Sequence, residues 1–206
     1  MKDWRLIYII FAKSEDKLYI SNKNRQAYFV LLSVCIIFVR INLKNCNVMF
    51  DKETYVQRRA LLKKNIGSGV LLFLGNDEQG LNYEDNAFRY RQDSTFLYYF
   101  GLSFAGLSAI IDIDEDKEII FGDELTIDHI VWMGTQPTLK EKSERVGIRE
   151  TLPSAAIISY LHKAVQKGQT VHYLPPYRPE HKLKLMDWLG IPPARQEGSV
   201  PFIRAV

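Results

Sequence analysis

YRQDSTFLYYFG, residues 90–101, is the stretch on which the fold prediction rests. It combines five aromatic residues with two polar side chains, Arg91 and Gln92, that can anchor a loop, a substrate or a partner chain. Its second half, Thr95–Phe100, is rich in aromatic residues and precedes Gly101, a pattern that predicts a buried strand. The stretch indicates a rigid core element entered through a polar hinge, a common mount for a functional site. The alternative is a well-packed strand whose arginine has no special role.

The composition is that of a soluble globular protein with one ordinary domain: 206 residues, 47% hydrophobic and 25% charged. The net charge of +3 is unevenly spread, because residues 1–48 hold eight Lys/Arg and three Asp/Glu, which leaves −2 for residues 49–206. That balance argues against nucleic acid as a partner, although Arg89, Tyr90 and Arg91 lie near aromatic residues as in single-strand binders. Both cysteines lie in residues 1–48, and their absence elsewhere favours a reducing, cytoplasmic location.

Residues 1–48 differ from the rest of the chain and contain neither glycine nor proline. The apolar run Ala27–Val39 has thirteen residues, fewer than the roughly 20 of a stable membrane span, and no signal-peptidase site follows it. Three interpretations stay open: a signal-anchor-like segment, an added strand or helix, or translated sequence upstream of a natural start at Met49. We favour the last, so the predicted organisation is an atypical extension at 1–48 and one domain at 49–206.

From residue 50 onward the pattern alternates between strands and helices, which predicts an α/β fold with a mixed β-sheet flanked by helices. In the first helix acidic residues come early and basic ones late, and Gly67 follows as a C-cap. This pattern places Leu61 on the apolar face and Arg59 off it, and a later helix has Val165 on its apolar face. The expected helices are 51–65, 138–145, 153–167 and 179–189; the expected strands are 69–75, 107–113, 118–121 and 170–174; and 76–89 is an acidic loop.

The central stretch resembles the YRQxSxFxYxxG signature of the aminopeptidase P N-terminal domain, which heads Xaa-Pro aminopeptidases of the prolidase/creatinase superfamily. Further motifs follow in the family's order, among them an Arg-Arg-x-x-Leu helix at 58–62, the hairpin and the Ile130–Gly134 segment. The resemblance runs from about residue 50 to the end of the chain and leaves residues 1–48 without a counterpart. The signature falls on Tyr90, Arg91, Gln92, Ser94, Phe96, Tyr98 and Gly101.

The resemblance implies a two-domain enzyme that removes an N-terminal residue preceding proline. Its C-terminal domain holds two metal ions, usually manganese, through two Asp, one His and two Glu. That domain is absent from this sequence, and the histidines present do not have the spacing of a dinuclear site. We therefore expect no catalytic residue and no metal in this chain, which would be inactive alone. Two manganese ions are expected in the catalytic domain, whose substrates are Xaa-Pro peptides.

The resemblance also implies what the N-terminal domain does: it supports a homo-oligomer, a dimer or tetramer, and lines the substrate pocket beside its own catalytic domain. Family pocket residues fall on Asp85, whose carboxylate could pair with a substrate amino group, and on Trp132, whose ring offers a flat apolar face. The polar half of the stretch would be a hinge that sets Asp85 beside Trp132, so Arg91→Ala would loosen folding or assembly first. The alternatives are core packing for Trp132 and, for the chain, a stand-alone dimerisation or binding module without peptidase activity.

Overall fold

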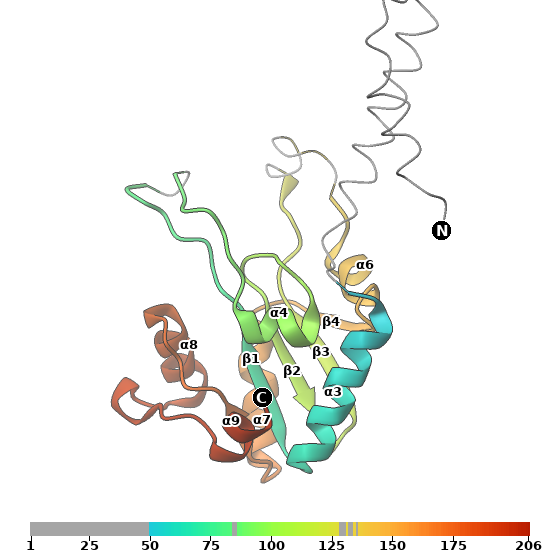
Figure 1. Cartoon of the computed structure of the whole chain (residues 1–206). Coiled ribbons are helices and arrows are strands. Elements are labelled where there is room, and N and C mark those ends of the chain that lie inside the picture. The colour runs from blue at the N-terminus through green and yellow to red at the C-terminus, as the bar shows by residue number, and fades with distance from the viewer. Residues whose placement is uncertain (1–49, 84–85, 128–130, 132–133, 135) are drawn as a thin grey trace, which may run out of the picture. The chain divides into compact units, whose positions relative to one another are not determined.

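The computed structural model describes residues 50–83, 86–127, 131, 134 and 136–206, and its described part is a mixed five-stranded sheet with helices on both faces (Figure 1). The strands are β1 Val70–Leu74, β2 Ser108–Asp112, β3 Lys117–Phe121, β4 Glu150–Leu152 and β5 Val171–Tyr173. The helices are α3 Lys52–Ile66, α4 Ser94–Phe100, α6 Leu139–Glu144, α7 Ala156–Gln166, α8 Pro179–Leu189 and α9 Val200–Ala205, with a 3-10 turn at Pro193–Arg195. The α/β class predicted from the sequence is confirmed.

The strand order β4-β3-β2-β1-β5 determines which loops come together. Strand β2 is antiparallel to both of its neighbours, whereas β5 is parallel to β1 and β4 is parallel to β3. Four strands therefore end at one edge of the sheet, which we call the carboxyl edge. Figure 1 shows the long loops after β1 and β3 projecting together from this edge.

The two faces of β1 explain its continuous apolar sequence, since neighbouring side chains in a strand point to opposite faces. Leu71 and Phe73 pack with the aromatic residues of α3, α4 and α9 on one face. Val70 and Leu72 pack with Ile157 and other apolar residues of α7 and α8 on the other. Both layers consist of buried apolar side chains, and they hold the sheet between its helices.

The predicted strand at Thr95–Phe100 is wrong, because this segment is helix α4. Asp93 caps the helix by accepting hydrogen bonds from the backbone N–H groups of Thr95 and Phe96, both 2.9 Å. The buried residues, Phe96, Tyr99 and Phe100, follow the helical spacing i, i+3, i+4, while Tyr98 is exposed. Burial is confirmed for Phe96, Tyr99 and Phe100, but the expectation that Tyr98 is buried with them is wrong, because a helix turns Tyr98 toward solvent.

The remaining predicted elements form close to their predicted bounds, with local corrections. Arg59, expected off the apolar face of the first helix, is fully buried, whereas Leu61 is 60% exposed. Val165, expected on the apolar face of α7, is exposed as well. Two elements were not predicted: the short strand β4, and α9, whose Phe202 is buried against Phe73 with ring centroids 5.1 Å apart.

Candidate functional site

The loop after β1 forms a projecting arm, which we define as residues 76–83 and 86–90. Its two sides pair as a short hairpin: the Leu81 N–H donates to the Asn86 carbonyl at 2.7 Å, and the Phe88 N–H donates to the Gln79 carbonyl at 2.9 Å. Leu81, Tyr83 and Phe88 are more than half exposed although they are large and apolar. Apolar side chains displayed on a projecting loop are typical of a surface that contacts another domain or chain.

The two ends of the arm meet at Asn76 and Tyr90, and we call this junction the neck. Gln92 lies beside the neck, and its side chain is almost fully buried. Its Oε1 accepts from the backbone N–H groups of Asn76 at 2.7 Å and Asp93 at 2.9 Å. Its Nε2 donates to the carbonyls of Phe104 at 2.8 Å and Leu102 at 3.3 Å. One amide thus joins the start of the arm, the start of α4 and the segment after α4.

Tyr90 and Asn76 complete the neck. The Tyr90 hydroxyl donates to the Phe104 carbonyl at 2.6 Å, and its burial raises the pKa of the phenol well above the ordinary value. The Asn76 side chain donates from Nδ2 to the Arg91 carbonyl at 2.9 Å. The base of the arm is therefore rigid on both of its sides.

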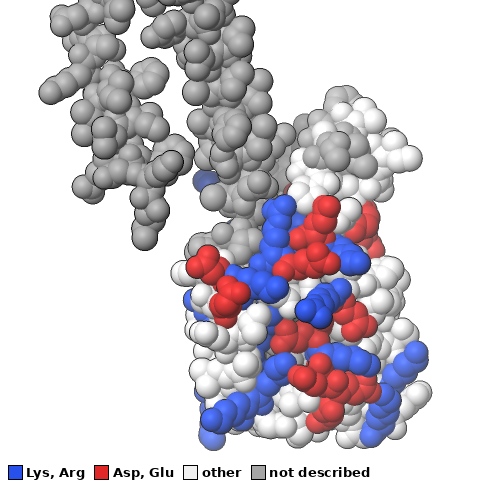
Figure 2. Space-filling model, turned by 90° about the vertical axis from the view of Figure 1, so that its right-hand side faces the viewer, with Lys and Arg blue, Asp and Glu red and all other residues white. Residues whose placement is uncertain are grey.

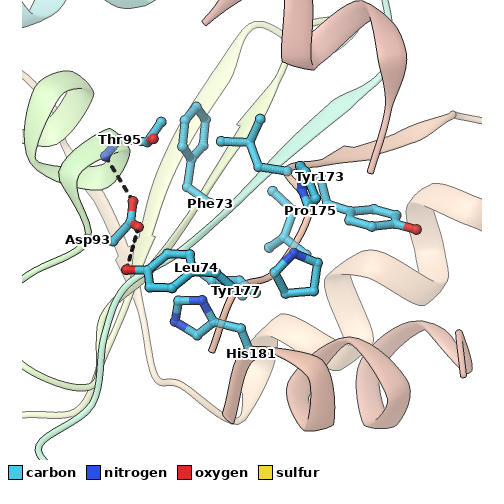
Figure 3. Close-up of a pocket in the computed structure, with 11 residues that line it drawn as sticks. Phe73, Leu74, Asp93, Thr95, Tyr173, Pro175, Tyr177 and His181 are labelled. Atoms are coloured by element: carbon cyan, nitrogen blue, oxygen red, sulfur yellow. Dashed lines mark hydrogen bonds between the residues drawn. The ribbon is translucent and has the colours of Figure 1, made fainter. Parts of the chain in front are cut away.

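The start of α4 meets the loop after β5 at a second junction (Figure 3). Asp93 uses one carboxylate oxygen to cap the helix, and the other accepts from the Tyr177 hydroxyl at 3.1 Å. The junction lines a pocket of about 110 Å³ whose other walls include Pro175 and His181. The His181 Nε2 lies 3.0 Å from the Gly75 carbonyl, so it donates this hydrogen bond. Burial lowers the pKa of this imidazole, which favours its neutral form.

The end of α4 is fixed from the other side of the domain. Gly101 has φ +64°, and a Cβ there would lie 2.3 Å from the ring of the buried Tyr55. The buried Arg59 donates to the carbonyls of Tyr99 and Val146, each at 2.9 Å, and pairs with Glu118 at 2.7 Å. Gly101 is therefore required twice, by backbone conformation and by lack of space.

Three residues of the signature are exposed, and they differ in their contacts. Tyr98 is half-exposed and lies under the Arg58 guanidinium, 4.0 Å from its ring centroid. Ser94 is exposed in the first turn of α4. Arg91 is also exposed, and its side chain has no hydrogen bond, ion pair or ring contact in the part of the chain that the structure describes. Tyr90 and Gln92 make the hydrogen bonds of the hinge. Arg91 was expected to stabilise the hinge as well, but its side chain makes no contact there among the described residues.

The two predicted pocket residues, Asp85 and Trp132, lie outside the described residues, and their roles stay predictions. Their described neighbours show what each loop exposes. Tyr83 on the arm is 61% exposed, and Val131, a helical residue in the segment after β3, is 75% exposed. These two described residues belong to segments that leave the carboxyl edge, where ligands bind in many open α/β sheets.

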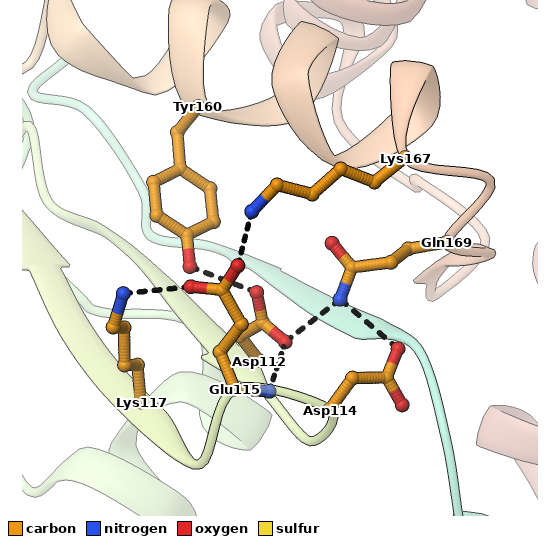
Figure 4. A network of polar contacts seen from close by, with 7 residues as sticks. All are labelled: Asp112, Asp114, Glu115, Lys117, Tyr160, Lys167 and Gln169. Atoms are coloured by element: carbon orange, nitrogen blue, oxygen red, sulfur yellow. Dashed lines mark hydrogen bonds and ion pairs between the residues drawn. The ribbon is translucent and has the colours of Figure 1, made fainter.

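A polar network at the opposite edge of the sheet is structural (Figure 4). The buried Asp112 accepts from the Tyr160 hydroxyl at 2.9 Å, from Gln169 Nε2 at 2.9 Å and from the Glu115 N–H at 3.0 Å. The pKa of the Tyr160 phenol is raised mainly by burial and, to a smaller extent, by the hydrogen bond and negative charge of Asp112. No side-chain polar atom of the network is buried without a hydrogen-bond partner, and the network fastens α7 to the β2–β3 hairpin.

Metal ligands are not grouped within the described ranges, where no set of three or more His, Cys, Asp or Glu could hold an ion. His162 is exposed on α7, His172 lies within β5, and His181 is bonded to a backbone carbonyl. His129 lies outside the described residues. This donor set does not fit a dinuclear manganese centre, and the expectation of manganese in another domain stays a prediction.

The surface charge is mixed on the face that carries α3 and α6 (Figure 2). Basic and acidic side chains intermingle there, for example where Lys63 pairs with Asp116 and Glu118, each at 3.0 Å. Such a face lacks the single-sign patch that a nucleic-acid backbone requires. Among the described residues no helix is long and apolar enough to cross a bilayer, and the run Ala27–Val39 lies outside them.

Comparison with known proteins gives one consistent result. The family described as "Aminopeptidase P, N-terminal domain" matches residues 55–173. A probable Xaa-Pro aminopeptidase of Chaetomium globosum is 29% identical over 112 residues, 52% of this chain and 18% of that protein. The human Xaa-Pro dipeptidase is 33% identical over 76 residues, 35% of this chain and 15% of that protein. The chain thus spans less than a fifth of these relatives.

Solved structures show the same fold. The Pseudomonas aeruginosa aminopeptidase matches with a TM-score of 0.60 and 21% identity, over 74% of this chain and 35% of that one. An Escherichia coli aminopeptidase P structure matches with a TM-score of 0.58 and 18% identity, over 68% and 33% respectively. The family resemblance drawn from residues 90–101 is confirmed.

Proposed function

This chain belongs to the aminopeptidase P N-terminal domain family, and we propose that it is the non-catalytic domain of an Xaa-Pro aminopeptidase. In that enzyme the carboxyl edge would form part of the substrate pocket and support a homo-oligomer. One observation carries the proposal: two residues of the family signature, Gln92 and Tyr90, hydrogen-bond across the neck of the arm and hold it in place. A rigid neck is needed when a loop must hold a substrate contact in place.

Two loop residues would supply the contacts. The Asp85 carboxylate would pair with the free α-amino group that an aminopeptidase must recognise, a charge-assisted contact. The Trp132 indole would provide a flat apolar wall for the substrate side chain or the proline ring. The catalytic domain would hold the metal ions, proposed to be manganese, which supply the Lewis acidity for hydrolysis. A cytoplasmic location is part of the same proposal.

The first test uses the chain by itself. Purified chain with added manganese should release no N-terminal residue from an Xaa-Pro peptide, and robust turnover would refute the non-catalytic role. The second test uses the complete peptidase. Trp132→Ala should raise KM more than it lowers kcat, because the indole contributes binding rather than chemistry. Unchanged kinetics would remove Trp132 from the substrate pocket.

A further inference from the structure

Helix α8 contacts the base of the arm through three side chains. The Lys184 ammonium pairs with the Asp77 carboxylate at 2.7 Å. Glu180 accepts a hydrogen bond from the Gln79 side chain, and His181 donates to the Gly75 carbonyl. We call these three contacts the α8 brace.

The two arm side chains in the brace are two residues apart, and their partners on α8 are one helical turn apart. Asp77 pairs with Lys184 and Gln79 with Glu180, and residues four apart on a helix lie on the same face. The third contact, from His181, is to the backbone carbonyl of Gly75, just before the arm. One face of α8 therefore holds both arm side chains.

Helix α8 is itself anchored to the sheet, which makes it a fixed support. Leu185 is fully buried in the apolar layer shared with α7, and Gly190 ends the helix in a left-handed conformation. The hydrogen bonds of Gln92 hold the arm where it leaves the sheet, at Asn76. They do not reach the hairpin part of the arm, which begins at Gln79. Asp77 and Gln79 lie beyond the neck. Among the described residues, the side chains of the brace are the only ones that bond to the side chains of Asp77 and Gln79.

We propose that Glu180 and Lys184 are positioning residues, which set the direction in which the arm leaves the sheet. Through the arm they fix where Leu81, Tyr83 and Phe88 meet the neighbouring domain or subunit. Neither residue touches substrate. The consequence for peptide binding rests on the proposed function of the arm, whereas the brace itself is a property of this chain.

The first experiment measures the arm in the chain as it is. Lys184→Met keeps a long unbranched side chain and removes the charge, which also lies 6.0 Å from the centroid of the Trp188 ring. Amide hydrogen exchange of the peptide covering 76–90, followed by mass spectrometry, should become about two- to fivefold faster, as expected for loss of one partly exposed ion pair. Exchange in β1 and β2 should stay unchanged.

The control is Lys63→Met, because Lys63 is also ion-paired and its side chain is 22% exposed, against 23% for Lys184. It should leave exchange of the arm unchanged. Exchanging the charges, by Asp77→Lys together with Lys184→Asp, should restore slow exchange. Unchanged arm exchange in Lys184→Met would overturn the proposal, as would an equal increase in the core, which would indicate global unfolding instead.

The second experiment separates the brace from the function of the arm. In the complete peptidase, Lys184→Met should raise KM for an Xaa-Pro peptide while kcat is retained, and the charge exchange should restore KM. If the arm loosens and KM does not change, the brace stands and the pocket role of the arm fails.

Discussion

Replacing Gln92 by methionine should destabilise the domain by about 3 kcal/mol. Methionine matches the length and buried volume of glutamine but makes none of its hydrogen bonds. Three of the four bonds are 2.7–2.9 Å long, and each is worth about 1 kcal/mol net; the fourth, to the Leu102 carbonyl, is 3.3 Å long and adds little. The buried N–H and carbonyl groups that remain would be left without partners.

Urea denaturation followed by circular dichroism measures this loss as a lower midpoint with an unchanged m-value. Gln57→Met, at an exposed position of α3, is the control and should change the free energy of unfolding by less than about 0.5 kcal/mol. A loss below about 1 kcal/mol for Gln92→Met would refute the assignment of Gln92 as the closure of the neck.

Gln92→Glu adds a pH dependence with a definite sign. The introduced carboxyl would be buried facing the Phe104 and Leu102 carbonyls, so its pKa would lie above the unfolded value. An acid whose pKa is raised on folding contributes stability that is present below the unfolded pKa and is lost as the pH rises through the folded pKa. The stability difference from the parent chain should therefore be smaller at pH 4 than at pH 7, and a difference that grew on acidification would contradict the reasoning.

Three further changes test separate parts of the fold. Gly101→Ala should cost about 2–4 kcal/mol in urea denaturation, because it adds a Cβ at positive φ and crowds the Tyr55 ring, and a neutral result would show that α4 ends differently. His181→Gln should cost less stability relative to the parent at about pH 5.5 than at about pH 7.5. Burial lowers the pKa of His181, so the imidazole of the unfolded parent chain takes up a proton below about pH 6.5 and the stability that neutral His181 contributes is lost. A stability difference that does not change with pH would exclude this linkage. Arg91→Ala should change stability by less than about 0.5 kcal/mol, since the side chain is exposed without a described partner, and a large thermal shift would reveal a contact of Arg91.

The sequence predicts most of the fold because its signals are local. The glycine-bounded apolar run around β1 and the Pro179 and Gly190 boundaries of α8 each specify one element, and both form as predicted. The failure at α4 is also local. Aromatic residues at 96, 98, 99 and 100 fit a buried strand or a short helix, and Asp93 as an N-cap was the signal that could have decided it.

The site was less predictable because its contacts join distant parts of the chain. Gln92 and Tyr90 were found through the family signature, but their partners at Asn76 and Phe104 follow only from the packing of loops. The partner of Asp77 lies 107 residues away on α8. No periodicity in the sequence reports such a pair.

The most direct test of the central claim is the Michaelis constant of the complete peptidase with Asp85→Asn. A charge-assisted contact to the substrate amino group is worth about 1.5–3 kcal/mol, which corresponds to a roughly 10- to 150-fold change in affinity. The control is Asp116→Asn, at the β2–β3 turn on the opposite edge of the sheet. We expect KM for an Xaa-Pro peptide to rise by at least about tenfold in Asp85→Asn alone, with a smaller change in kcat. Equal kcat/KM values for the two variants and the parent would contradict it.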